Sequence, residues 1–184
     1  MPNFFTKIIS SFTNKEVKPE LKVEIQIENK NIKDDLFDFK IDERDRLKHG
    51  WDEVFYATFS DDLNKMLRVV DMKTIPINRH FLLQTIVNHS YKLRKEDKYR
   101  EMCLKYAEQH LKEFDEIAPV LLSKNQPTRV STFQNYSTVL TEIGKFEEAI
   151  KVCEMAISYG LNDGTKGNYV GRIEKINKKI LSIK

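Results

Sequence analysis

Strong helix breakers are scarce in this chain. Of its 184 residues, 6 are glycine and 5 are proline, which is about half the share that globular proteins usually carry. Because glycine and proline punctuate turns and linkers, their scarcity argues against a turn-rich β-sandwich and against a flexible linker protein. The sequence therefore predicts long regular elements.

Cysteine and long apolar runs are scarce as well. The two cysteines, Cys103 and Cys153, lack Cys-x-x-Cys spacing, which excludes a disulfide framework and a four-thiolate metal site. No apolar stretch approaches the length of a membrane span. The first twelve residues are interrupted by Lys7 and lack the cleavage pattern of a secretory signal. We expect a cytoplasmic protein with two free thiols that binds no membrane.

A large charge of one sign is also missing, since the formal net charge is +3. The charge is unevenly distributed: residues 1–19 carry +2, residues 20–62 carry −6 and residues 63–184 carry +7. The acidic and basic parts could attract each other within one chain or between two copies, or form two separately solvated surfaces.

The apolar pattern predicts two parts, an N-terminal arm with a β-hairpin in residues 1–42 and a helical domain in residues 43–184. Residues 21–27 alternate strictly between apolar and polar side chains, and the alternation returns from Phe37 to Ile41, as in two half-buried strands. Two strands alone are barely stable in water. The hairpin is therefore expected to pack on its own helices or to pair with a second copy as a homo-oligomer.

From residue 43 onward the apolar period becomes helical. We expect about seven helices, the first with an apolar face running from Leu47 through Trp51 to Thr58. Ser60 and Asn78 are predicted to cap the next two helices.

Further along the chain, Asp97 is predicted to begin a helix that Pro119 ends or kinks. Helices near 129–143 and 146–159 are each closed by a glycine, and a last helix begins near Thr165.

The helix pair at 129–159 has a distinctive spacing. Bulky and small residues fall at successive intervals of 3, 1, 3, 4, 2, 3, 4 and 3, at Phe133, Tyr136, Ser137, Leu140, Gly144, Phe146, Ala149, Cys153 and Ala156. This pattern resembles a tetratricopeptide repeat. Gly144 suits a tight left-handed turn, and the small Ala149 and Ala156 allow close helix crossings.

An earlier pair repeats these spacings 47 residues upstream, at Ile86, His89, Ser90, Leu93, Asp97, Tyr99, Met102, Tyr106 and Gln109. Tandem repeats of this family return about every 34 residues, so residues 111–128 are expected to extend the second helix and its loop. In this alignment Met102 and Gln109 replace the small residues. The resemblance covers residues 80–160, and the basic final helix suits the cap that such an array needs.

The resemblance implies a non-enzymatic scaffold without cofactors that binds a protein or peptide on the surface formed by the first helix of each pair. The residues carried onto this surface are Gln84, Val87, Asn88, Tyr91 and Arg94 in the first pair, and Ser131, Gln134, Asn135, Thr138 and Thr141 in the second. Asn88 and Asn135 hold matching places, and an amide can both donate to and accept from a ligand backbone. The alternative is that these side chains face water or are covered by residues 1–60.

Two other functions stay open. Arg44 and His49 have the Arg-x4-His spacing of a class of helical ribonucleases, in which the arginine steadies phosphate charge and the histidine performs acid–base cleavage. Basic clusters at residues 92–100 and 175–179 could bind nucleic acid, although acidic residues lie among the basic ones in the first cluster. The four histidines show no zinc-ligand spacing, so no metal site is predicted. His89 and His110 are expected to be half-buried.

Overall fold

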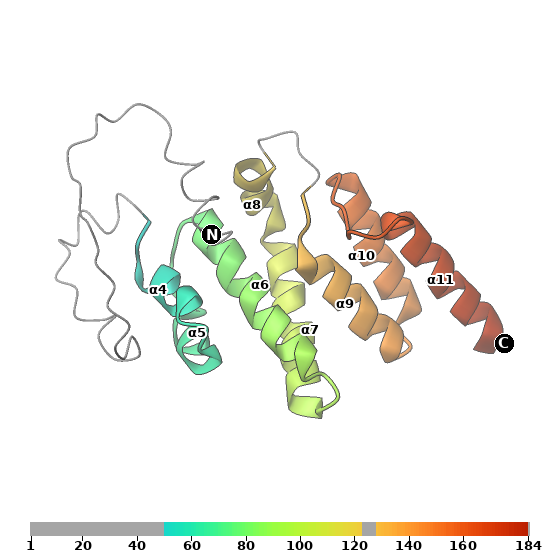
Figure 1. Cartoon of the computed structure of the whole chain (residues 1–184), viewed down its shortest axis with the longest axis horizontal. Helices are drawn as coiled ribbons and strands as arrows, with labels where there is room; N and C mark the ends of the chain where they lie inside the picture. The colour runs from blue at the N-terminus through green and yellow to red at the C-terminus, as the bar shows by residue number, and fades with distance from the viewer. Residues whose placement is uncertain (1–49, 123–127, 184) are drawn as a thin grey trace. The chain divides into compact units, whose positions relative to one another are not determined.

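The computed structural model describes residues 50–122 and 128–183 (Figure 1). These residues form eight helices and no strand, so the expectation of a mainly helical protein is confirmed. The predicted hairpin, Arg44 and His49 lie outside the described residues. Within the two described stretches, no helix is both long enough and apolar enough to cross a membrane.

Helix α4 (Glu53–Phe59) is shorter than expected at its start. Asp52 is extended, and its carboxylate accepts a hydrogen bond of 2.8 Å from the backbone N–H of Phe55. Gly50 has a φ of +68°, which is incompatible with a right-handed helix. Trp51 therefore precedes the helix and is exposed, so the predicted apolar face is wrong at this residue, whereas Val54 and Thr58 of that face are buried. Leu47 lies outside the described residues.

Helix α5 (Leu63–Val69) begins at a different cap from the predicted one. The carboxylate of Asp62, rather than the hydroxyl of Ser60, accepts from the backbone N–H groups of Asn64 and Lys65. An aspartate also places negative charge at the positive end of the helix dipole.

Helix α6 (Pro76–Lys92) begins two residues before the predicted cap. Ile75 is the capping residue and Pro76 occupies the first turn, where the missing N–H of proline costs nothing. Asn78 lies inside the helix instead. Its side-chain amide donates to the carbonyl of Gly50 at 2.6 Å and to Asp52 at 3.1 Å, so it fixes the chain segment that enters α4.

Helix α7 (Asp97–Lys112) begins at the predicted residue, and α8 (Phe114–Leu121) follows directly. The expected extension of the second helix is thus a separate short helix. Pro119 lies within α8, and the helix ends two residues later. Phe114 of α8 is fully buried and meets the ring of Phe133 edge-on.

Helices α9 (Ser131–Glu142) and α10 (Phe146–Ser158) each end two residues before a predicted glycine. Gly144 and Gly160 have φ values of +82° and +66°, as in left-handed helix ends. The last helix, α11 (Asn168–Ile183), begins three residues later than predicted.

The helices pack as successive neighbours (Figure 1). Helix α6 packs on α7, α9 on α10 and α10 on α11, while α9 contacts both α6 and α7. One core cluster lies mainly in α4–α7 and another mainly in α8–α11. Leu104 and Tyr136 contact both clusters, so the two pairs share one continuous interior. The two free cysteines are buried in it.

The second helices of the two pairs match with a spacing of 46 residues, not 47. Their buried positions are Cys103, Tyr106, Ala107 and His110 in α7 and Ala149, Val152, Cys153 and Ala156 in α10. Met102 and Gln109 are half-buried, so the prediction that they replace the small residues is wrong. The close-packing positions are one residue later, because the connection between the helices differs by one residue between the pairs.

Candidate ligand face on helices α6 and α9

A ladder of hydrogen bonds joins the two helices that the sequence predicted to form a binding surface. Oδ1 of Asn88 lies 2.8 Å from both Oγ of Ser131 and Nδ2 of Asn135. One turn earlier on α6, Oε1 of Gln84 accepts from the backbone N–H of Ser131 at 3.1 Å. The predicted residues therefore meet each other directly, and Gln84 satisfies an N–H at the start of α9.

The predicted residues fall into two groups, which differ in how far their side chains are buried. Asn135 is 8% exposed and Val87 is fully buried, so the prediction that Val87 faces a ligand is wrong. Gln84, Asn88, Gln134 and Thr138 are half-buried and keep an accessible part. We call these four side chains the α6/α9 face.

At the far end of α6, Tyr91 and Arg94 are tied to the second pair. The guanidinium of Arg94 makes a bidentate contact with the carboxylate of Glu142, at 2.9 Å for Nε–Oε2 and for Nη2–Oε1. It also lies over the ring of Tyr91, 4.0 Å from the ring centroid. The pairing with Glu142 neutralises Arg94, which leaves it less suited to hold an anionic ligand.

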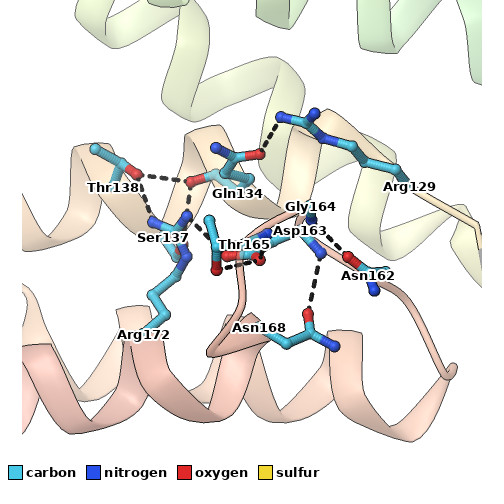
Figure 2. Close-up of polar contacts among 10 residues, drawn as sticks. All are labelled: Arg129, Gln134, Ser137, Thr138, Asn162, Asp163, Gly164, Thr165, Asn168 and Arg172. Carbon is cyan, nitrogen blue, oxygen red and sulfur yellow. Dashed lines mark hydrogen bonds and ion pairs between the residues drawn. The ribbon is translucent and has the colours of Figure 1, made fainter.

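On α9, two further arginines approach the face (Figure 2). Nη2 of Arg129 donates to Oε1 of Gln134 at 2.8 Å. Nη1 of Arg172, from α11, lies 3.0 Å from Oγ1 of Thr138. Neither arginine was predicted on this surface, because one comes from a loop and the other from another helix. The two arginines bring positive charge next to the neutral side chains of Gln134 and Thr138.

The loop before α11 fixes Arg172 through a buried carboxylate (Figure 2). Nη2 of Arg172 lies 3.1 Å from Asp163, whose side chain is 1% exposed. Burial alone would raise the pKa of Asp163, but hydrogen bonds from Thr165 and Arg172 hold it below its usual value. Asp163 is therefore ionised at neutral pH and holds the arginine in place.

A buried histidine pair was not expected from the sequence. Nδ1 of His80 lies 3.0 Å from Nε2 of His110, whose Nδ1 lies 2.8 Å from the hydroxyl of Thr132. The expectation of a half-buried His110 is wrong, since it is 0% exposed. Burial lowers the pKa of His80 to about 4. Burial also lowers the pKa of His110 well below its ordinary value, and His80 and Arg79 lower it further.

Both rings are therefore neutral at pH 7 and link α6, α7 and α9. His80 and His110 are 30 positions apart on two helices, so no local spacing in the sequence predicts their contact. His89, by contrast, is half-buried as expected, and its Nε2 lies 2.8 Å from Asp61.

A cavity of about 370 Å³ opens beside the N-terminal part of α6. Its lining includes Arg79 and Glu113, whose side chains form a bidentate pair at 2.6 and 2.9 Å. The hydrogen bond from Arg79 holds the pKa of Glu113 below its usual value. Because the two charges satisfy each other, the pair serves as a link between α6 and the α7–α8 junction.

Within residues 50–122 and 128–183, no group of three or more His, Cys, Asp or Glu side chains could hold a metal ion. Comparison of the chain with protein-family models, with curated proteins and with solved structures gave no match. The resemblance to tetratricopeptide repeats therefore stays a prediction.

Proposed function

We propose that this chain is a protein-interaction module of tetratricopeptide-repeat type that binds a peptide segment of a partner protein on the α6/α9 face. The observation that carries the proposal is the ladder between Asn88 and Asn135. It places matching residues of two helix pairs side by side, so that α6 and α9 present one continuous polar surface. Repeat arrays commonly use the surface formed by equivalent helices for binding.

The face keeps hydrogen-bonding capacity after the ladder is formed. Oδ1 of Asn88 and Oε1 of Gln84 serve as ladder acceptors, and Oε1 of Gln134 accepts from Arg129. Across the part of the chain that the structure describes, the amide NH₂ groups of these three side chains donate no hydrogen bond. Each NH₂ can donate twice, which suits the carbonyl groups of a peptide backbone.

One substitution separates ligand binding from folding. Asn88→Asp keeps an oxygen that accepts from Ser131 and Asn135, and it removes the NH₂ group. Peptides selected from a random display library against the full chain would be measured by fluorescence anisotropy against wild type and variant. We expect Asn88→Asp to weaken the selected peptides by about tenfold, the cost of leaving a peptide carbonyl without its donor.

The matched control is Asn64→Asp on α5, which makes the same charge change at an exposed position. Equal affinities of wild type and Asn88→Asp for every selected peptide would exclude the α6/α9 face as the binding surface. A library that yields no peptide at all would remove the proposal.

The remaining expectations stay predictions. A ribonuclease would need Arg44 and His49, and a homo-oligomer would need the N-terminal hairpin, all of which lie outside the described residues. A cytoplasmic location is likewise a prediction. No observation on the described helices favours catalysis, so we propose no second function.

A further inference from the structure

Three cationic side chains from outside α9 contact successive turns of that helix. Arg129 contacts the side chain of Gln134, Arg172 contacts Thr138, and Nζ of Lys179 lies 3.3 Å from the carbonyl oxygen of Thr141. Positions 134, 138 and 141 lie on one side of a helix. The three cations, which we call the α9 cation row, therefore lie along the edge of the α6/α9 face that is turned toward α11.

Neutral groups anchor the row on α9. The acceptors of Arg129, Arg172 and Lys179 on this helix are an amide oxygen, a hydroxyl and a backbone carbonyl. Among the described ion pairs, a carboxylate neutralises Arg172 alone, and that carboxylate is the buried Asp163. Arg129 and Lys179 are exposed, and neither has a carboxylate partner among the described ion pairs.

The neighbouring surface adds to this charge. Lys175 lies between Arg172 and Lys179 on the same side of α11 and is exposed. Of the three carboxylates nearest in sequence to the far end of α9, Glu142 is paired with Arg94 and Glu148 with Lys145, whereas the exposed Glu147 makes no described ion pair. The α9 cation row is therefore a positive edge beside a neutral, amide-rich face.

The spacing of the row indicates what it can bind. From position 134 to 141 the helix rises about 10 Å, so neighbouring anchors are about 5 Å apart. In an extended peptide, alternate side chains lie on one side at intervals of about 6.6 Å. Carboxylates at every second residue of a partner peptide match the row to within the reach of long arginine and lysine side chains.

We propose that the α6/α9 face takes an acidic peptide in extended conformation, with internal Asp or Glu side chains on the α9 cation row and its backbone on the amides. This inference rests on the proposed function and adds the chemistry of the partner. The carboxylates belong to side chains, so no free C-terminus is needed. Nucleic acid is disfavoured, because the α9 cation row could neutralise only a few phosphates and the four side chains of the α6/α9 face are uncharged.

The test uses the full chain and ten-residue peptides, acetylated and amidated so that they carry no terminal charge. A peptide of alternating Glu and Ser is compared with its Gln–Ser and Lys–Ser counterparts and with a ten-nucleotide single-stranded RNA. Binding is measured by fluorescence anisotropy at 50 and 150 mM salt. We expect the Glu–Ser peptide to bind at least tenfold more tightly than the Gln–Ser peptide, with a difference that shrinks at the higher salt.

The variant Arg129→Gln/Lys179→Gln removes the two exposed charges and leaves Arg172 on its buried carboxylate. We expect it to lose about tenfold in affinity for the Glu–Ser peptide. The matched control, Lys95→Gln/Lys151→Gln, makes the same change of net charge at exposed positions outside the row, and it should bind within twofold of wild type.

The outcomes separate this inference from the proposed function. Equal binding of the Glu–Ser and Gln–Ser peptides, or equal loss in both double variants, would overturn the acidic partner. The proposed function would stand in that case if library-selected neutral peptides still respond to Asn88→Asp. RNA binding that is tighter than Glu–Ser binding and lost in Arg129→Gln/Lys179→Gln would also overturn the inference. Failure of all peptides, selected ones included, would remove both proposals.

Discussion

Oδ1 of Asn88 lies 2.8 Å from Nδ2 of Asn135, 47 residues further along the chain. The same oxygen accepts from Ser131, and Gln84, also 47 residues before Ser131, accepts from its backbone N–H. Residues at matching places in two helix pairs thus bond to each other. This contact sets the register between α6 and α9. The candidate ligand surface therefore also holds the two helix pairs together.

The first prediction concerns this ladder. Asn88→Ala removes the acceptor of two hydrogen bonds and leaves the amide of Asn135, which is 8% exposed, without a partner. We expect the free energy of unfolding to fall by about 2 kcal/mol, measured by urea denaturation. Asn88→Ala/Asn135→Ala should cost less than the sum of the single variants. The exposed Asn177→Ala serves as control, and strict additivity of the two single variants would contradict the ladder.

The second prediction concerns the buried histidine pair. The pKa of His80 falls from 6.5 to about 4 on folding, so the unfolded chain binds more protons than the folded one between these values. Stability is therefore fully present above pH 6.5 and is lost as the pH falls toward 4. The loss from His80 is on the order of 3 kcal/mol. Urea denaturation at several pH values between neutral and mildly acidic measures it.

The comparison variant for the histidine pair is His80→Gln, which should show a shallower fall over the same pH range. His89→Gln is the matched control, because it removes a half-buried histidine and keeps every carboxylate. If wild type and His80→Gln lose stability with equal slopes, the buried neutral pair is not responsible for the pH dependence.

Local signals predicted much of the fold. Gly144 and Gly160 mark helix ends, because glycine adopts a left-handed backbone conformation without a steric penalty. Asp97 begins α7 as expected. The first helices of the pairs matched at 47 residues because helical periodicity within one element is regular. The second helices were misaligned by one residue, since the connection between two helices carries no such period.

The candidate site was only partly predictable. Asn88 and Asn135 were placed on one surface, but nothing in their spacing indicated that they bond to each other. Arg129 and Arg172 reach α9 from a loop and from a different helix, so they depend on tertiary packing. The pairing of His80 with His110 depends on it in the same way.

The third prediction contrasts two glycines that differ in backbone conformation, although both have room for a methyl group. Gly144 has a φ of +82°, whereas Gly171 lies inside α11, and neither has an atom within 4 Å of the place that a Cβ would occupy. Gly144→Ala should cost about 1 kcal/mol through the left-handed backbone. Gly171→Ala should gain about 0.5 kcal/mol, because alanine loses less entropy in a helix. Thermal denaturation should shift in opposite directions, and a shift of the same sign in both variants would contradict the assigned backbone.

The fourth prediction concerns the ion pair of Asp163 and Arg172, whose side chains are 1% and 20% exposed. Arg172→Met leaves a carboxylate buried without its cation, and we expect a loss of about 3 kcal/mol at pH 7. The pKa of Asp163 lies below its usual value in the wild type and must rise in the variant. The deficit of Arg172→Met should therefore shrink as the pH is lowered and the carboxyl becomes protonated. Asp163→Asn/Arg172→Met removes both charges and should recover part of the lost stability at pH 7. Urea denaturation of the three proteins at pH 7 and pH 4 checks this, and a deficit that stays constant between the two pH values would show that Arg172 stabilises the fold by packing rather than by charge.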